Sequence, residues 1–412
     1  MSLIAVDLTP VLPGGENGGA KILAIELLKS FQKKAPADRF LLLTASWNHE
    51  ELAILDGHNM GRLCVLKREQ ARRKPLTIPY FGRLERLLRR IYNLIRRRIR
   101  PSPLGGRLLR SRGVDLLFCP FTAPTYAEPG IPVVPLIHDL QHRIYPQFFS
   151  AQEIDNRDTF FYSVKKTANS IICVSEYVRQ CAMRYLNTPP ESIHAVPNCI
   201  QGRLTKLAAA DLGEHLTGLG IVQHRYMFYP ANFWPHKNHR MLLAAYGIFA
   251  ARNPGEKIDL VLTGGLDELQ EELKDAAKQM NLIKRVHFLG FLPQEKLIAV
   301  LQGCEFLIFP SLYEGFGIPV LEAMSMGKPV MCSNTTSLPE VAGNAALYFD
   351  PRMPEDIVRG MEKMVTDPGF RNDLASRGYQ RVKMFRSEDM TNKYLEIFRS
   401  AMNNAALQKV EE

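Results

Sequence analysis

The sequence lacks several features that would point to particular classes of protein. No apolar run approaches the roughly 20 residues that span a bilayer, so no transmembrane helix is predicted. The seven cysteines form no C-x-x-C pair, and no histidine cluster has the spacing of metal ligands. We therefore expect reduced, mostly buried thiols, as in a cytoplasmic protein. The start, MSLIAVDLTP, has no basic segment before a long apolar one, which predicts a first strand and not a signal peptide.

The composition is that of an ordinary folded protein. The chain has 412 residues, of which 46% are hydrophobic and 23% are charged, so it is neither fibrous nor disordered. This length predicts two or three domains, each large enough to bury its own core.

Charge is unevenly distributed along the chain. The 52 basic and 42 acidic residues give a net charge of +10, but residues 67–112 alone hold 16 basic and 2 acidic residues. Leucine and isoleucine recur at helical spacing between residues 84 and 99, arginines occupy the positions between them, and Pro101 follows. The pattern predicts a basic amphipathic helix. Such a helix binds an anionic membrane surface, packs on the domain with a solvated basic face, or binds nucleic acid. We favour the membrane, because aromatic stacking residues and other nucleic-acid motifs are lacking.

Short apolar runs alternate with helical patterns throughout the chain, which predicts parallel sheets with crossover helices. We expect a helix over residues 20–33, another near 152–168 and a last one over about 385–406. The alternation weakens after Asn198 and restarts at RYMFYPA, so the second half repeats the architecture of the first. The predicted fold class is α/β, with two doubly wound Rossmann-like domains facing a central cleft. In such sheets ligands bind beyond the carboxyl ends of the strands.

Two sites of interest follow strands in the first half. A glycine-rich segment that includes Gly18 and Gly19 precedes the first helix, where backbone N–H groups favour an anion, although a plain flexible connector is the alternative. G-x-G-x-x-G is absent, so a dinucleotide fingerprint is not supported. His138 follows an apolar strand, and it is either a substrate contact or a structural histidine.

A cation follows the first strand of the second half. Lys237 lies in a turn between that strand and a helix that we expect to begin near Asn238. A lysine there is well placed to hold a phosphate, because the helix start adds its dipole and N–H donors. Solvent exposure without function is the alternative.

The strongest motif is the segment FPSLYEGFGIPVLEAMSMGKPV at residues 309–330, which predicts a strand, a loop, a helix and another strand. Glu314 lies in the loop and Glu322 follows eight residues later in an apolar helix. A carboxylate in such surroundings needs partners, and sugar hydroxyls are suitable ones. The backbone N–H groups of Gly315, Phe316, Gly317 and Ile318 form a potential diphosphate site at a helix N-terminus. Two solvated glutamates beside a turn are the alternative.

This segment is similar to the E-x7-E motif of retaining glycosyltransferases of family 4, which have the two-domain GT-B fold. Other segments fall in the order of that family. They are Gly18-Gly19, His138-Asp139, Val174-Ser175-Glu176, Val196-Pro197-Asn198, Pro235-His236-Lys237-Asn238 and Leu289-Gly290. The resemblance covers most of the chain and is mannosyltransferase-like, although the motif does not identify the sugar.

The resemblance implies roles for these residues. Gly18 and Gly19 would approach the diphosphate or the donor sugar, and His138 would lie near the transferred sugar. Lys237 would neutralise the leaving diphosphate, and Glu314, with the N–H groups of Phe316 and Gly317, would hold the hexose. The remaining donor contacts would come from Glu322 at the ribose and from Phe291 and Leu292 at the nucleobase. Pro230-Ala231 stands where many members have a glycine and an arginine, so His236 or another residue would compensate for the missing positive charge.

Three regions are predicted. Residues 1–200 form an acceptor-side domain that carries the basic region 67–112, and residues 201–385 form the domain that binds the nucleotide-sugar. Residues 386–412 form a helix that crosses back to the first domain. We expect no metal, because D-x-D is absent, and no cofactor apart from the donor substrate.

The predicted function is transfer of a hexose, best assigned as mannose from GDP-mannose, to a lipid-linked or glycan acceptor in surface polysaccharide synthesis. The alternatives are a UDP-hexose donor, a GT-B epimerase or phosphorylase, and a non-catalytic nucleotide-sugar or nucleic-acid binder. The expected location is the cytoplasm, at the inner face of the plasma membrane.

Overall fold

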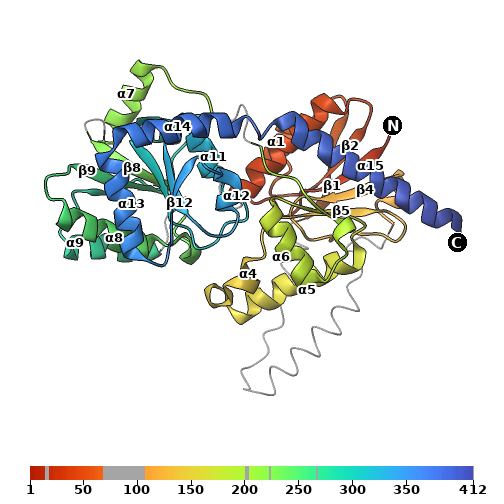
Figure 1. Ribbon diagram of the computed structural model, residues 1–412. Helices are drawn as coiled ribbons and strands as arrows, with labels where there is room; N and C mark the ends of the chain where they lie inside the picture. The colour runs from red at the N-terminus through yellow and green to blue at the C-terminus, as the bar shows by residue number, and fades with distance from the viewer. Residues whose placement is uncertain (14–17, 68–106, 200–203, 222–223, 266–267, 412) are drawn as a thin grey trace. The chain divides into compact units, whose positions relative to one another are not determined.

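The computed structural model describes residues 1–13, 18–67, 107–199, 204–221, 224–265 and 268–411. The predicted basic helix between residues 84 and 99 lies outside the described residues. The chain divides into two compact units (Figure 1). The first unit comprises Met1–Val174, Val178–Val196 and Glu388–Glu412, and the second comprises Ser175–Tyr177 and Pro197–Ser387.

The first unit contains a parallel sheet of seven strands in the order β3-β2-β1-β4-β5-β6-β7. The strands are β1 (Leu3–Asp7), β2 (Arg39–Ala45), β3 (Met60–Leu66), β4 (Leu116–Cys119), β5 (Val133–Ile137), β6 (Ile171–Cys173) and β7 (Ile193–Ala195). The α-helices are α1 (Gly18–Lys34), α4 (Gln141–Ile144), α5 (Ala151–Thr167), α6 (Glu176–Leu186) and α15 (Ser387–Glu411), and the 3-10 helices are η1 (Glu51–Leu55), η2 (Arg110–Arg112), η3 (Pro146–Phe148) and η4 (Pro190–Ser192).

The core of the first unit includes a cluster of aromatic rings from distant parts of the chain. Phe31 of α1 and Phe118 of β4 contact Tyr394 of α15 edge-on, with centroids 6.0 and 5.8 Å away. Phe398, one turn further along α15, contacts the same two rings. Edge-to-face packing suits the ring quadrupoles and adds to the free energy gained from burial. The last helix therefore completes the core of the unit in which the chain begins.

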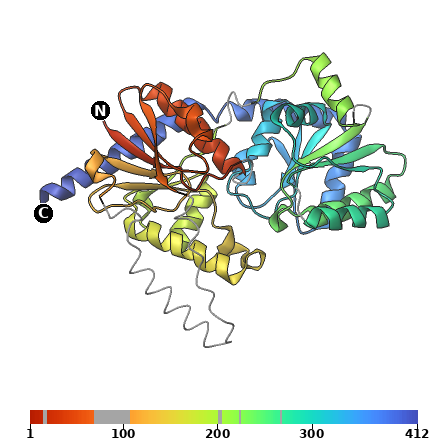
Figure 2. The ribbon, with the colours of Figure 1, turned by 180° about the vertical axis from the view of Figure 1, so that it is seen from behind.

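The second unit contains a parallel sheet of six strands in the order β10-β9-β8-β11-β12-β13. The strands are β8 (Arg225–Pro230), β9 (Ile258–Thr263), β10 (Val286–Phe288), β11 (Phe306–Phe309), β12 (Val330–Ser333) and β13 (Ala346–Phe349). The helices are α7 (Ala209–Gly218), the 3-10 helix η5 (Pro235–Lys237), α8 (His239–Arg252), α9 (Glu268–Gln279), α10 (Gln294–Gly303), α11 (Ile318–Ser325), α12 (Leu338–Ala342), α13 (Pro354–Thr366) and α14 (Pro368–Val382). The two opposite views in Figures 1 and 2 show helices on both faces of this sheet.

The strand sequences agree with this architecture. A parallel sheet covered on both faces needs strands that are mainly apolar, and every residue of β4, β5, β9 and β11 is buried, although β9 includes the polar residues Asp259 and Thr263. Both sheets are entirely parallel, with helices between most of their strands, which confirms the predicted pair of doubly wound Rossmann-like domains.

The surroundings of the cysteines can be compared with the expectation of mostly buried thiols. None of the seven cysteines is in a disulfide, and five are buried, whereas Cys64 is exposed and Cys199 is half-buried.

Candidate active site

Two charged side chains meet at the carboxyl edge of the second sheet. Lys237 follows β8 and Glu314 follows β11, and these strands are neighbours. The Nζ of Lys237 lies 2.6 Å from Oε1 of Glu314, and the two side chains are only 14% and 11% exposed. A largely buried ion pair is costly to desolvate, so its place beyond two strand ends indicates a binding role more than a stabilising one.

Hydrogen bonds fix the turn that carries Lys237. Asn238 adopts a left-handed conformation with φ of 65°, and its amide donates to the carbonyls of Pro310 and Pro351 at 3.1 and 2.8 Å. The Tyr229 hydroxyl donates to the carbonyl of Lys237 at 2.8 Å. The lysine backbone is therefore tied to β8, to the segment after β11 and to the segment after β13. A side chain on so constrained a turn can be placed accurately against a ligand.

Two hydroxyl groups in the loop after β12 form hydrogen bonds with the main chain of Glu314. Its N–H donates to the hydroxyl of Thr336 at 3.2 Å, and its carbonyl accepts from the hydroxyl of Ser337 at 3.0 Å. Thr336 itself has φ of 58°, an uncommon conformation for a β-branched residue. Nothing in the E-x7-E motif indicated Thr336 or Ser337, which belong to a separate segment of the chain.

The loop after Glu314 turns directly into α11. Gly317 has φ of 99° as the residue before the helix, and a Cβ there would overlap the side chain of Leu338. Phe316 is buried against Phe385, with centroids 5.8 Å apart. The helix begins at Ile318, so the first N–H groups of α11 lie beside Gly315 and Glu314, where the sequence predicts an anion site.

Glu322 lies in the second turn of α11 and is 6% exposed. The helix starts only at Ile318, so the eight residues that separate Glu314 from Glu322 are partly loop and partly helix. The two carboxylates are therefore not stacked along two turns of one helix. Instead, the first lies in the turn and the second on the helix that this turn begins.

The predicted nucleobase contacts lie at the same edge of the sheet, two strands from β8. Phe291 is 69% exposed, whereas Leu292 is almost buried. The loop that carries them is held because the N–H of Gly264, after β9, donates to the carbonyl of Gly290 at 2.9 Å. A large apolar ring left in water is a suitable surface for stacking a base.

His236 takes part in the turn through its main chain. Its carbonyl accepts from the N–H of Leu312 at 2.8 Å, which joins the segment after β8 to the segment after β11. Its ring lies beside that of Trp234, with centroids 5.7 Å apart. That His236 adds positive charge near the phosphates of the donor stays a prediction.

The structure also brings His239 into this region, which sequence reasoning did not single out. The side chain is 2% exposed and lies between the rings of Tyr229 and Phe233, with centroids 4.8 and 4.5 Å away. Burial, with a smaller effect of the nearby Lys237 charge, lowers the pKa of His239 to about 3. The imidazole therefore stays neutral at physiological pH and adds bulk without adding charge.

The remaining predicted site residues belong to the first unit. His138 follows β5, and its Nε2–H donates to the carbonyl of Pro120 at 2.7 Å. Loss of hydration lowers the pKa of His138, so the ring is neutral and its tautomer is set by this bond. Gly18, with φ of 51°, and Gly19 open α1, and residues 14–17 of the glycine-rich segment lie outside the described residues.

Asp7 is a further polar residue that the sequence reasoning missed. It ends β1 and is 1% exposed, and its Oδ1 accepts from the N–H and the hydroxyl of Thr9 at 3.0 and 2.6 Å. Burial raises the pKa of Asp7 to about 6, against the smaller opposing effect of these bonds. The sequence pattern that could have indicated Asp7 is an acidic residue at the end of an apolar strand.

Comparison with known proteins identifies the family. A model described as "Glycosyltransferase Family 4" matches residues 18–201, and one described as "Glycosyl transferases group 1" matches residues 219–381. Among curated proteins, the chain is 27% identical to the O-antigen chain mannosyltransferase B of Escherichia coli over 65% of this chain and 70% of the relative. It is 30% identical to the serotype-specific mannosyltransferase WbdA of Escherichia coli over 50% of this chain, and this alignment spans only 26% of WbdA.

Solved structures show the same architecture. HepE of Anabaena, crystallised with UDP and glucose, superposes with a TM-score of 0.71 over 97% of this chain and all of HepE, at 17% identity. With the two family matches, this fold defines a glycosyltransferase of the GT-B type. The chain belongs to glycosyltransferase family 4, and its sequence is mannosyltransferase-like.

The described part of the chain contains no helix that is both long enough and apolar enough to cross a membrane.

Proposed function

We propose that the protein is a retaining hexosyltransferase that moves mannose from GDP-mannose to a lipid-linked or glycan acceptor of a surface polysaccharide. Similarity to O-antigen mannosyltransferases supports the sugar and the pathway class. The observation that carries the proposal is the ion pair of Lys237 and Glu314 beyond the carboxyl ends of two adjacent strands.

Lys237 stabilises the leaving group. Cleavage of the bond between the anomeric carbon and phosphate builds negative charge on the diphosphate, and a preorganised ammonium offsets it. The N–H groups at the start of α11 add donors beside the same charge. In the resting protein Glu314 keeps Lys237 in place, and the donor inserts its phosphate oxygens and its sugar hydroxyls next to these two side chains.

The other donor contacts follow from the same placement. Glu322 accepts hydrogen bonds from the ribose hydroxyls, and Phe291 with Leu292 packs against the nucleobase. Gly18, Gly19 and His138 of the first unit are the proposed contacts to the phosphate and the transferred sugar. A neutral His138 serves as a hydrogen-bond donor or acceptor and not as a second cation.

Retention requires the acceptor to attack from the face that the phosphate leaves. The departing phosphate oxygen takes the acceptor proton, and no protein side chain is assigned as the base. The sequence has no D-x-D motif, and a lysine with helix N–H donors supplies the charge that a metal gives elsewhere. We therefore propose transfer without a metal.

The acceptor is proposed to lie at the inner face of the plasma membrane. The excess of arginine in residues 67–112 supports binding to anionic headgroups, since each basic residue near such a surface contributes about 1 kcal/mol.

The donor can be tested with a thermal-shift panel of GDP-mannose, UDP-glucose, UDP-GlcNAc and UDP-galactose. A ligand that binds the folded state alone raises Tm in proportion to its binding, so GDP-mannose should give the largest shift. Product analysis by NMR with GDP-mannose and a chelator should then show an α-linked mannose. A selective shift with a UDP-hexose would replace the donor, and a β-linked product would refute retention.

A further inference from the structure

Three potential metal ligands meet at the amino edge of the second sheet, which the proposed function leaves unused. Nδ1 of His224 lies 2.6 Å from Oδ2 of Asp259, and Nε2 of His287 lies 2.7 Å from the same oxygen. The three ligand atoms all lie within 4.8 Å of one another. Two imidazoles and a carboxylate converge here, although they come from separate parts of the sequence.

The strand register explains this convergence. Asp259 of β9 pairs with Tyr226 of β8, and His224 lies two residues before Tyr226. His287 of β10 pairs with Val261, two residues after Asp259. Because side chains alternate between the two faces of a sheet, all three ligands lie on one face. The sheet therefore holds Asp259 and His287 on neighbouring strands, which place ligands more accurately than loops do, and His224 directly precedes the strand on the other side of β9.

The cluster is accessible to an ion. The side chains of His224, His287 and Asp259 are 40%, 20% and 10% exposed, so the carboxylate is sheltered and one ring faces solvent. His224 and Asp259 line an open recess of about 520 Å³. A cation can enter through this recess without any rearrangement of the core.

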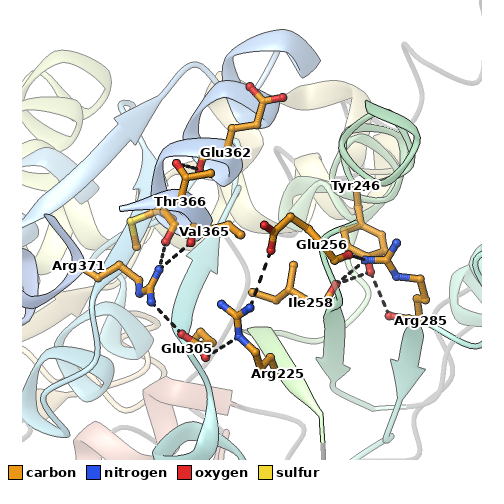
Figure 3. A network of polar contacts seen from close by, with 11 residues as sticks. Arg225, Tyr246, Glu256, Ile258, Arg285, Glu305, Glu362, Val365, Thr366 and Arg371 are labelled. Carbon is orange, nitrogen blue, oxygen red and sulfur yellow. Dashed lines mark hydrogen bonds and ion pairs between the residues drawn. The ribbon is translucent and has the colours of Figure 1, made fainter. Parts of the chain in front are cut away.

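The two nearby arginines, Arg225 and Arg285, are held by other groups. Figure 3 shows Arg225 between Glu256 and Glu305, and Arg285 directed at backbone carbonyls. Nη2 of Arg285 donates to the carbonyls of Glu256 and Ile258 at 2.8 and 3.0 Å. Its Nε lies 3.9 Å from Oδ1 of Asp259, which leaves Oδ2 to the two histidines. Lys257 and Lys284 also border the recess.

We infer that His224, Asp259 and His287 form a binding site for a divalent transition metal, with Zn²⁺ as the best match. Imidazole nitrogen with one carboxylate oxygen suits zinc, cobalt or nickel, whereas magnesium and calcium prefer oxygen ligands. The metal takes the place of the protons that face Oδ2, so each ring binds it through the nitrogen that has lost its proton, and the neutral ring then carries its proton on the opposite nitrogen. Water fills the fourth position of a tetrahedral site.

The site lies at the opposite edge of the sheet from Lys237 and Glu314, which follow the carboxyl ends of β8 and β11. A metal there does not reach the reacting groups. It joins the segment before β8 to β9 and β10, and it therefore stabilises the folded second unit.

The test uses full-length, tag-free protein that has been dialysed against a chelator. Titration calorimetry with Zn²⁺, without nucleotide, should give one site per chain, and Zn²⁺ should raise Tm. His224→Ala and His287→Ala should each weaken binding about 100-fold or more, because even partners outside the ligand shell contribute 10- to 100-fold. Co²⁺ bound to the wild type should show the visible absorption of a four-coordinate site, and both variants should lose it.

Two substitutions serve as controls. His58→Ala removes an exposed histidine of the first unit, and Cys64→Ser removes the exposed thiol, so both should bind Zn²⁺ as the wild type does. His224 is the most exposed of the three ligands, so its variant should keep the wild-type Tm in chelator. Absence of stoichiometric binding by the wild type, or equal binding by the wild type and both histidine variants, would overturn the inference.

Discussion

At the scale of single residues, the chemistry depends on a few side chains whose surroundings limit what they can do. Lys237 and Glu314 are paired and largely buried, so each holds the other in position. His239 is neutral and packs between the rings of Tyr229 and Phe233, next to the turn that carries Lys237.

Removal of either charged partner should abolish or severely reduce transfer. Lys237→Ala should lower kcat by about 100- to 1,000-fold, the usual effect of losing one group that stabilises transition-state charge. Glu314→Ala should abolish transfer with little change in Tm, since main-chain bonds to Thr336 and Ser337 hold the loop. Kinetic assays with Lys274→Ala, which removes a surface pair, provide the matched control. An active Glu314→Ala variant would refute its role.

His239 should make stability depend on pH. The unfolded chain protonates this residue near pH 6.5, whereas the folded chain resists protonation until about pH 3. Stability is therefore complete above pH 6.5 and falls as the pH is lowered, by about 1.4 kcal/mol per pH unit between these values.

Urea unfolding at pH 7 and pH 5 measures this effect. His239→Phe, an apolar ring among aromatic neighbours, should show a smaller loss at pH 5 than the wild type does. His58→Ala, at an exposed position, should keep the wild-type dependence. Equal pH dependence in the wild type and His239→Phe would contradict the assignment.

At the scale of elements, the site depends on how strands end and helices begin. The turn after β8 and the loop before α11 each contain one residue in a left-handed conformation, Asn238 and Gly317. Each of these two residues directly precedes a helix, Asn238 before α8 and Gly317 before α11.

Gly317→Ala should disrupt the start of α11. The left-handed conformation costs a residue with a Cβ about 1–2 kcal/mol, and contact with Leu338 adds to this cost. We expect a lower Tm and a raised KM for the donor. Gly255→Ala is the control, because Gly255 has no positive φ and open space around it. Equal Tm and KM for the two variants would show that the conformation is not needed.

The arginine-rich segment should control attachment to lipid. Replacement of Arg89, Arg90, Arg96, Arg97 and Arg98 by serine removes five positive charges, so the variant should be released from anionic liposomes in a sedimentation assay while donor hydrolysis is retained. Binding that persists in the variant would exclude this segment as the membrane contact.

At the scale of the whole molecule, the chain ends in the unit where it began. Helix α15 supplies Tyr394 and Phe398 to a core that also contains Phe31 and Phe118, residues 276 to 367 positions away in sequence. We therefore expect the last helix to contribute strongly to the stability of the first unit.

Tyr394→Ala should destabilise the first unit by about 3–5 kcal/mol, because it leaves a cavity among aromatic rings. Tyr379→Ala is the matched control, since that ring is 54% exposed and its loss should change stability by no more than about 0.5 kcal/mol. Denaturant unfolding measures both, and similar effects of the two variants would contradict the importance of α15.

Much of the fold followed from the sequence, because each strand and helix is encoded by a short pattern of apolar residues. Alternating apolar runs and helical patterns predicted two parallel sheets, and polar residues after strand ends located Lys237 and Glu314. These signals are local, so no three-dimensional information was needed to read them.

Other features required contacts between residues that are distant in sequence. Thr336 and Ser337 hold Glu314 from another loop, His239 is neutral only because aromatic rings bury it, and His224, Asp259 and His287 meet only through strand register. The sequence by itself determined which elements form and which residues follow them, since local periodicity and turn residues encode these. Only the tertiary structure decided which side chains contact one another and which buried groups stay charged, since both depend on packing between separate segments.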